Sequence, residues 1–183
     1  MTVIGKGSFM RIMGIDPGYG IVGFGVVEHC HGRFTLVTAG AITTKSDMEF
    51  FSRLRVIYND MQGLVTHYRP DELAVEKLFF NTNVTTGIDV AQARGVTLLP
   101  AIMQNIPIYE YTPLQVKSSI VGYGYAEKKQ VQEMVRNMLH LSDIIKPDDA
   151  SDAVAMALTH GLSLGTRDLM KKYEETAKKQ GGL

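Results

Sequence analysis

Apolar and β-branched residues crowd three short runs near the start of the chain. The runs are MRIMGID at 10–16, IVGFGVVEH at 21–29 and RFTLVTAGAITT at 33–44. Only short breaks that contain Gly or His separate them. Strand-like runs joined by such short breaks are typical of hairpins, so the pattern predicts an antiparallel meander of three strands.

The hydrophobic period then changes to that of a helix. Ser46 and Glu49 fit a capping box, which marks a helix start, and Arg69-Pro70 stops the pattern. Between them runs an apolar stripe with helical spacing, which we expect to face the core. It consists of Phe50, Leu54, Ile57, Tyr58, Met61, Leu64 and Val65.

The rest of the chain alternates short strands with helices. Strands are expected at 72–76 and 108–111, and helices at 114–121, 126–141, 148–164 and from about Val84 onward. Gly95 lies on the apolar stripe of the helix that starts near Val84, where its missing side chain would permit a close approach. The stripe that we expect to be buried contains Val84, Ile88, Ala91, Leu98, Leu99 and Ile102.

This order of elements predicts an α/β fold. Three strands, a helix, a strand, a helix, a strand and further helices favour a five-stranded mixed sheet rather than an all-parallel one. The sheet combines the antiparallel meander with two parallel strands, and helices are expected on both faces. The ends of the first and fourth strands then come together if those two strands are neighbours.

Composition bounds the picture without naming a function. The chain has 183 residues, of which 45% are hydrophobic and 21% charged, so one domain with one good core is expected. Its single cysteine excludes an internal disulfide, and no apolar stretch approaches the roughly 20 residues that span a bilayer. We therefore expect a cytoplasmic protein without a membrane partner.

The domain is expected to occupy residues 10–164. The first nine residues lack the apolar core of a signal peptide, and they resemble an upstream extension or a cloning remnant. Residues 165–183 form a charged tail whose last three residues are Gly-Gly-Leu, and we expect it to be frayed or to form a short amphipathic helix that docks on a partner.

Four acidic residues carry the strongest chemical signal. Asp16 in GIDPG and Glu76 in LAVEK end runs that are typical of buried strands, where an unpaired negative charge is unfavourable. Asp149 and Asp152 are spaced i, i+3, so they project from one helix face. Carboxylates in such a group are the ligands of hard divalent cations, and Mg²⁺ held this way commonly handles phosphates.

Each acid also has an ordinary structural explanation. Asp before Pro-Gly is common in turns, a Glu at a strand end can be exposed, and acids at a helix start complement its dipole. The combination favours the metal site. If the final helix places Asp149 and Asp152 across the ends of the first and fourth strands, two ions about 3.5–4 Å apart would suit in-line hydrolysis of a phosphodiester.

Net charge neither supports nor excludes a polyanionic partner. The 19 Lys and Arg residues balance the 19 Asp and Glu residues, which argues against a basic surface overall. Metal ions bound by four carboxylates would make the working surface more positive, and basic residues can still cluster locally. Lys117, Lys128, Lys129 and Arg136 lie within one short stretch.

Seven motifs along the chain share their order and wording with one family. They are GIDPG, AVEKLFF, VAQARGV, YTPLQVK, GYG, AEKKQV and PDDASDAVAMALTH. The chain is similar to the RuvC family of Holliday-junction resolvases from Met10 to about His160. The resemblance implies a ribonuclease-H-like fold and a homodimer that cuts four-way DNA junctions in recombination and repair. It also implies symmetric, Mg²⁺-dependent nicks with 5′ phosphate and 3′ hydroxyl ends, and a partnership with the RuvA–RuvB branch-migration complex.

The family's metal-binding and catalytic acids fall on Asp16, Glu76, Asp149 and Asp152. Some relatives have His at the position of Asp149, so an Asp there stays within the pattern. The resemblance implies two Mg²⁺ ions for each active site, with Mn²⁺ as a possible substitute.

The family's DNA contacts fall on four further positions. Phe79 matches an aromatic side chain that stacks beside the opened bases of the junction, although a core aromatic is the structural alternative. Lys117 and Lys128 match phosphate contacts, with a solvated helix face as the alternative. Arg94 could contact the DNA backbone or hold a structural ion pair. We expect His67, His140 and His160 to be ordinary surface or helix-end residues.

Three other functions fit parts of the sequence or its expected architecture. GIDPGYGIVGFG also resembles the first phosphate loop of actin-like ATPases, but those proteins need a second lobe for which this chain has no room. A ribonuclease acting on RNA·DNA hybrids shares the architecture and the acids, and only the wording of QARG, LQVK and AEKKQV argues against it. A non-catalytic nucleic-acid-binding module of the same fold would be expected to lack one of the acids, and none is missing.

Overall fold

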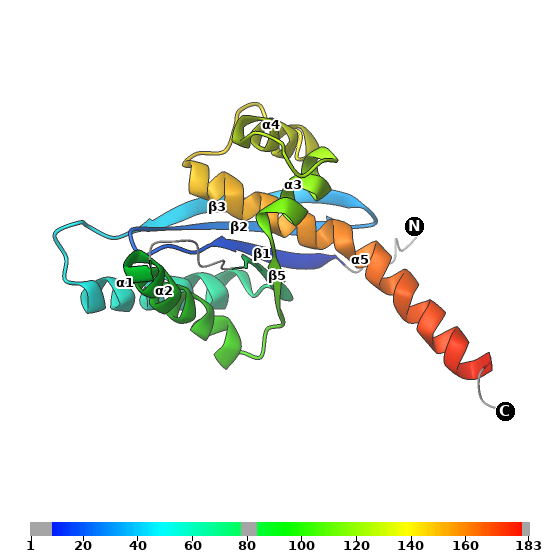
Figure 1. Ribbon diagram of the computed structural model, residues 1–183, viewed down its shortest axis with the longest axis horizontal. Helices are drawn as coiled ribbons and strands as arrows, with labels where there is room; N and C mark the ends of the chain where they lie inside the picture. Colours follow the sequence, from blue (N-terminus) through cyan, green and yellow to red (C-terminus); the bar gives the residue numbers. More distant parts are fainter. Residues whose placement is uncertain (1–8, 78–83, 181–183) are drawn as a thin grey trace, which may run out of the picture.

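The computed structural model describes residues 9–77 and 84–180, with side chains described for residues 9–77 and 87–165. Within these ranges the chain forms one five-stranded sheet in the order β3-β2-β1-β4-β5 (Figure 1). The predicted mixed sheet is confirmed. The strands are β1 Met10–Asp16, β2 Ile21–Cys30, β3 Arg33–Thr43, β4 Glu72–Glu76 and β5 Ile108–Tyr111.

The two halves of the sheet have different directions. β1, β2 and β3 form the expected antiparallel meander, whereas β4 runs parallel to β1 and β5 runs parallel to β4. The first and fourth strands are therefore neighbours, and the carboxyl ends of β1 and β4 lie at the same edge of the sheet.

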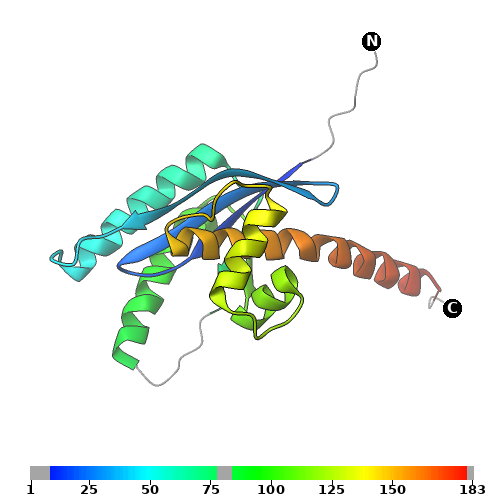
Figure 2. The same cartoon turned by 90° about the horizontal axis from the view of Figure 1, so that it is seen from above.

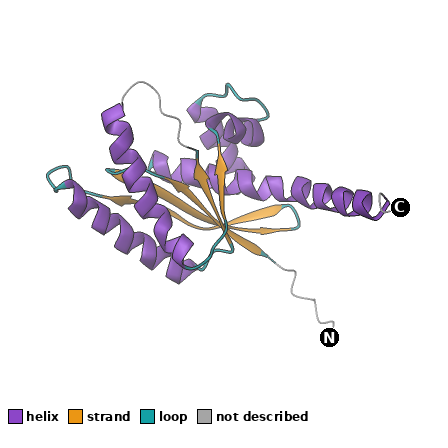
Figure 3. Cartoon of the chain, turned by 60° about the horizontal axis from the view of Figure 1, so that its bottom comes forward, coloured by secondary structure: helices purple, strands orange, loops and turns teal. Residues whose placement is uncertain are grey.

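Helices cover both faces, as predicted. Figures 1 and 3 show α1 and α2 on one face, and Figure 2 shows α5 lying across the strands of the other face with α3 and α4 over it. No described helix is long and apolar enough to cross a membrane. The helices are α1 Phe50–Tyr68, α2 Val84–Met103, α3 Pro113–Val121, α4 Lys128–Met138 and α5 Asp148–Gln180.

Alternate residues of the central strand divide the core between the two faces. Ile12 packs into the cluster beneath α3, α4 and α5, whereas Met13 and Ile15 pack into the cluster beneath α1 and α2. All three side chains are fully buried. This division follows from the period of two along a strand, and it leaves the strand's last residue, Asp16, at the edge of the core.

The start of α1 differs from the prediction. Glu49 is the N-cap, and its carboxylate accepts hydrogen bonds from the backbone amides of Phe51 and Ser52 at 3.0 and 2.9 Å. Ser46 lies outside the helix, so the predicted capping box is wrong. A carboxylate has two oxygens and satisfies two free amides at once, which a hydroxyl oxygen does less well. The predicted end is confirmed, since α1 stops at Tyr68.

The predicted buried stripe of α2 is only partly correct, since Leu98 is buried in the core but three other members are exposed. Ile88, Leu99 and Ile102 are 52%, 40% and 53% exposed, and nothing lies within 4 Å of a Cβ built at Gly95. The face that packs inward carries smaller residues, including the buried Ala93 and Ala101. α2 packs on α1, so the small residues allow the two helices to lie close together, while Ile88, Leu99 and Ile102 face outward.

Two segments near the end of the chain also differ. α4 begins at Lys128 and ends at Met138, so it is shorter than the predicted 126–141. α5 continues to Gln180 instead of ending near 164, so the tail, which we expected to be frayed or to form a short helix, is helical as far as that residue.

His160 is buried rather than a surface residue. Its side chain is fully enclosed, with Nε2 paired to the Glu72 carboxylate and Nδ1 2.7 Å from the Tyr111 hydroxyl. The hydroxyl of Tyr111 also lies 3.0 Å from that of Ser163. These contacts join α5 to β4 and β5. The sequence did not predict the burial of His160, because its partners Glu72 and Tyr111 are far from it along the chain.

Glycines in β1 and β2 let α5 lie directly on the sheet. A Cβ added at Gly14 would come within 3.0 Å of the backbone of Ala153 and Ala157, and one at Gly23 would clash with the carbonyl of Asp149. At Gly25 the clash would be with Val154. Side chains at these positions would lift the helix away from the strands.

We expect Gly14→Ala to lower the free energy of unfolding by at least about 2 kcal/mol, because the added methyl meets helix backbone that cannot rotate away. Denaturant unfolding of the purified variant measures this. Gly63→Ala is the matched control, since nothing lies within 4 Å of a Cβ there and Ala favours the helix by roughly 0.5–1 kcal/mol. Equal stability of Gly14→Ala and the wild type would contradict the close seating of α5.

Candidate active site

Two acids meet where parallel strands end side by side. Asp16 is the last residue of β1 and Glu76 is the last residue of β4. The register pairs Gly14 with Ala74 and Ile15 with Val75, so the acids follow directly on aligned positions. Both side chains are half-buried. The predicted convergence of the first and fourth strands is confirmed.

The start of α5 lies against the same edge. Asp16 pairs across the antiparallel ladder with Gly23, and the backbone carbonyl of Asp149 lies directly over Gly23. Asp149 is therefore held next to the strand pair that carries Asp16. Asp152 follows one turn later on the same helix.

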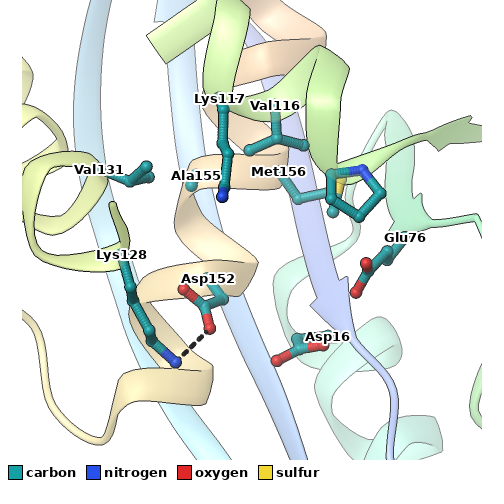
Figure 4. A pocket seen from close by; sticks show the side chains of 10 residues that line it. Asp16, Glu76, Val116, Lys117, Lys128, Val131, Asp152, Ala155 and Met156 are labelled. Carbon is teal, nitrogen blue, oxygen red and sulfur yellow. Dashed lines mark ion pairs between the residues drawn. The ribbon is translucent and has the colours of Figure 1, made fainter. Parts of the chain in front are cut away.

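A cavity of about 300 Å³ lies between these elements. Asp16, Glu76 and Asp152 line it, together with Lys117 and Lys128 (Figure 4). Asp149 is not among its lining residues. Apolar side chains form the remaining wall, which limits the water available to the charged groups, and they are Pro113, Val116, Val131, Ala155 and Met156.

The cluster is electrostatically unbalanced. Burial is the largest of the causes that raise the pKa of Asp16 from 3.8 to about 7. The negative charges of Asp152, Glu76 and Asp149 also contribute to this rise, and Lys128 opposes it. Burial and the charge of Asp152 likewise raise the pKa of Glu76. These shifts mean that the fold holds anions together without enough positive charge to neutralise them.

Lys128 supplies part of the missing positive charge. Its Nζ lies 2.8 Å from Oδ2 of Asp152 and 3.8 Å from Oδ2 of Asp148. The hydrogen bond with Asp152 raises the pKa of Lys128. Asp148 is also paired with Lys146 at 2.7 Å. In this structure the side chain of Lys128 is therefore paired with an acid of the cluster, and it does not extend from its helix into solvent alone.

The donor set fits a hard divalent cation, although the side chains are not yet arranged around one. Within residues 9–77 and 87–165, no three His, Cys, Asp or Glu side chains form a group that could hold a metal ion. The pocket's acids offer only oxygen ligands, and the raised pKa values of Asp16 and Glu76 show that a bound cation would relieve their repulsion. Asp152 is paired with Lys128 in this structure.

The predicted DNA contacts have different environments. Lys117 extends from α3 into the pocket, with its side chain near the acids in Figure 4. Phe79 lies outside the described residues.

Arg94 has a structural partner. Its guanidinium pairs with the Glu110 carboxylate of β5 and donates to the backbone carbonyl of Glu76 at 3.3 Å. Only 16% of its side chain is exposed. Of the two alternatives for Arg94, these contacts favour the structural ion pair over a contact with the DNA backbone. It braces the end of β4 and so helps to position Glu76.

Sequence reasoning missed the glycines that set the site. Gly23 and Gly25 stand alone inside a strand pattern, and an isolated Gly in a strand commonly marks a close approach of other backbone. That signal was available. No comparable sequence signal linked Arg94 to Glu110 or Lys128 to Asp152, because those pairs form only after the strands and helices assemble.

Comparisons with known proteins agree on one family. The model of the family "Crossover junction endodeoxyribonuclease RuvC" matches residues 12–160. The RuvC protein of Ruminiclostridium cellulolyticum is 51% identical over 154 residues, which cover 84% of this chain and 93% of that protein. The RuvC protein of Clostridioides difficile is 47% identical over 173 residues, which cover 94% of this chain and 98% of that protein.

The fold has a solved counterpart. The structure of T. thermophilus RuvC in complex with Holliday junction substrate superposes with a TM-score of 0.78 at 30% identity. The match covers 86% of this chain and 96% of that one. The yeast mitochondrial Holliday junction resolvase Ydc2 is similar in fold alone, with a TM-score of 0.60 at 14% identity over 90% of this chain and 86% of that one.

We expect Asp16→Asn to stabilise the metal-free protein at alkaline pH. The folded pKa of about 7 exceeds the ordinary 3.8, so the folded state binds this proton more tightly and wild-type stability falls as the pH rises from about 4 to 7. Asparagine avoids that loss, which amounts to up to about 4 kcal/mol.

Thermal and denaturant melts in chelator between pH 4 and pH 8.5 measure this difference. The gain of Asp16→Asn over the wild type should grow up to pH 7 and stay constant above it. Asp60→Asn, an exposed position on α1, is the control and should show no such trend. A gain that is independent of pH would mean that Asp16 is not desolvated.

Proposed function

The chain belongs to the RuvC family of crossover junction endodeoxyribonucleases, and we propose that the pocket between β1, β4 and α5 is where it cuts DNA. The protein is an endonuclease that binds and resolves Holliday junctions in recombination and repair. One observation carries the assignment of the site: Asp16, Glu76 and Asp152, from three separate elements, line one cavity with too little positive charge around them.

The nuclease is metal-dependent, and we propose Mg²⁺ as the metal, two ions for each site, with Mn²⁺ able to substitute. Asp16, Glu76, Asp149 and Asp152 would hold them. All four offer hard oxygen ligands, and Mg²⁺ favours such ligands where phosphate is handled. A metal held there would supply activation of the attacking water and stabilisation of the leaving 3′ oxygen of the cut strand.

The protein's own groups orient the scissile strand. Asp16 and Glu76 are fixed by the ends of two paired strands, so their carboxylates keep their spacing while DNA binds. Lys117 reaches the pocket from α3 and is placed to contact a phosphate beside them. Lys128 is the second proposed phosphate contact, and Phe79 is the proposed stacking partner of an opened base. Cutting leaves a 5′ phosphate and a 3′ hydroxyl.

We also propose that the protein acts as a homodimer. A junction has two equivalent strands of like polarity, so two active sites related by a two-fold axis can nick both symmetrically. The outward stripe of α2, formed by Ile88, Leu99, Ile102 and Met103, supports this interface because these side chains are 40% to 69% exposed. Gly95 lies on the same exposed face, where a partner helix could approach closely.

Two further proposals come from family membership. The protein works in the cytoplasm, and it cooperates with the RuvA–RuvB branch-migration complex at the junction.

An incision assay tests the function. A four-way junction, a linear duplex and an RNA·DNA hybrid are incubated side by side, with Mg²⁺ and with chelator. We expect symmetric nicks in the junction alone and only with Mg²⁺. Asp16→Asn should bind the junction within a few-fold of the wild type and cut it more than about 100-fold more slowly, because a ligand of the metal is lost. Equal cutting of the hybrid would favour a ribonuclease.

A charge on the α2 stripe tests the dimer. Ile102→Glu should weaken self-association by at least about 10-fold, because an unpaired carboxylate would be buried between the two helices. Sedimentation across a concentration series measures the dissociation constant. Val37→Glu introduces the same charge at a position on β3 that is 39% exposed, and it should leave association unchanged. Equal association of both variants would place the interface elsewhere.

A further inference from the structure

Lys128 is paired with Asp152, whose carboxylate is one of the proposed metal ligands. In Figure 4 its ammonium group points to Asp152, not out of the pocket. The Nζ to Oδ2 distance is 2.8 Å, which is a full hydrogen bond between opposite charges. A lysine waiting for a DNA phosphate would instead extend towards solvent.

Lys117 provides an internal comparison. It lines the same cavity, but in the described part of the chain no ion pair joins it to an acid. The two lysines of the pocket therefore differ in what they do before DNA arrives. Lys117 is available, whereas Lys128 is engaged.

The position of Lys128 in its helix supports a specific role for this contact. It is the first residue of α4, where the helix dipole disfavours a positive charge. Asp152 and Asp148 of α5 offset that disadvantage from across the pocket. Lys128 is therefore stabilised at this position by its ion pairs with the two acids, and not by the dipole of its own helix.

We infer that Lys128 is an exchangeable counter-cation, which holds Asp152 in the metal-free enzyme, gives it up when the metal binds, and only then contacts the DNA. This inference rests on the proposed function of the pocket. An ammonium group hydrogen-bonded to Asp152 and a divalent cation on the same carboxylate repel each other and compete for its oxygens. Metal loading and the DNA contact of Lys128 are therefore coupled.

The exchange is feasible because the ion pair is weak. The side chains of Lys128 and Asp152 are 53% and 36% exposed, so solvent replaces much of what the pair loses. Asp148 keeps Lys146 as a partner at 2.7 Å when Lys128 leaves. Breaking an exposed pair of this kind weakens metal binding by no more than roughly five-fold.

Metal binding without DNA is the first test. MgCl₂ is titrated into the wild type, Lys128→Met and Lys117→Met, and the apparent Kd is taken from the rise in melting temperature. Lys128→Met should bind Mg²⁺ roughly two- to five-fold more tightly than Lys117→Met, because both variants lose one positive charge but only Lys128 competes for a ligand. An equal Kd for the two variants would mean that Lys128 affects Mg²⁺ binding only through its charge, as Lys117 does, and would overturn the exchange.

Junction binding is the second test. The affinity for a four-way junction is measured in chelator and in Ca²⁺, which is used in place of Mg²⁺ to slow incision. Lys128→Met should weaken binding several-fold in Ca²⁺ and leave it unchanged in chelator, where the lysine is held by Asp152. Lys117→Met should weaken binding under both conditions.

The outcomes separate this inference from the function on which it rests. Equal weakening by Lys128→Met in chelator and in Ca²⁺ would show a permanent DNA contact, and would overturn the exchange while the wild type still cuts junctions. Failure of the wild type to cut junctions would overturn the function itself. Lys128 is half exposed at a helix start, so the methionine variant retains the core on which both tests depend.

Discussion

The direct contact between α5 and the glycines of β1 and β2 is the constraint on which the site depends. A helix usually packs on a sheet with side chains between them, but at Gly14, Gly23 and Gly25 there is no side chain. The backbone of α5 therefore lies close enough to bring Asp149 over Gly23, beside the end of β1. The parallel pairing of β1 and β4 brings Asp16 and Glu76 together, and the close seating of α5 adds Asp152 to the same pocket.

The sequence predicted the architecture well because its signals are local or periodic. Short breaks between β-rich runs predicted the meander, and the acids at strand ends predicted the edge of the sheet at which Asp16 and Glu76 meet. The predictions failed where the deciding partner is distant. His160 is buried against Glu72 and Tyr111, which lie far from it in the sequence. The capping box failed for a local reason, because the Glu49 carboxylate caps the amides of Phe51 and Ser52 itself. For Arg94 the sequence left two alternatives open, and only the assembled fold shows its pair with Glu110. For α2 the apolar period was correct, but period alone does not say whether a stripe faces a core or the surface.

The same pocket is unfavourable for stability and favourable for function. Burial of Asp16 among other carboxylates raises its pKa, so the ionised form destabilises the metal-free fold. A site of this kind favours a divalent cation because its carboxylates repel each other and a cation would balance their charge. A permanent, well-paired lysine would remove the repulsion and also the affinity for metal. The exposed and weak pairing of Lys128 with Asp152 reduces the repulsion without removing it.

β4 and α5 carry acids that repel each other at the pocket, and the opposite ends of these two elements are joined by a pair of side chains. β4 carries Glu72 at its start and Glu76 at its end, about 13 Å apart at the rise of a strand. α5 carries Asp152 and, about 12 Å further along at the rise of a helix, His160. The two elements run in opposite directions, so the attractive pair of Glu72 and His160 lies at one end when Glu76 and Asp152 share the pocket at the other. Because that pair is buried, it resists separation more strongly than an exposed one would, and it keeps the two acids in place while they are still without a cation.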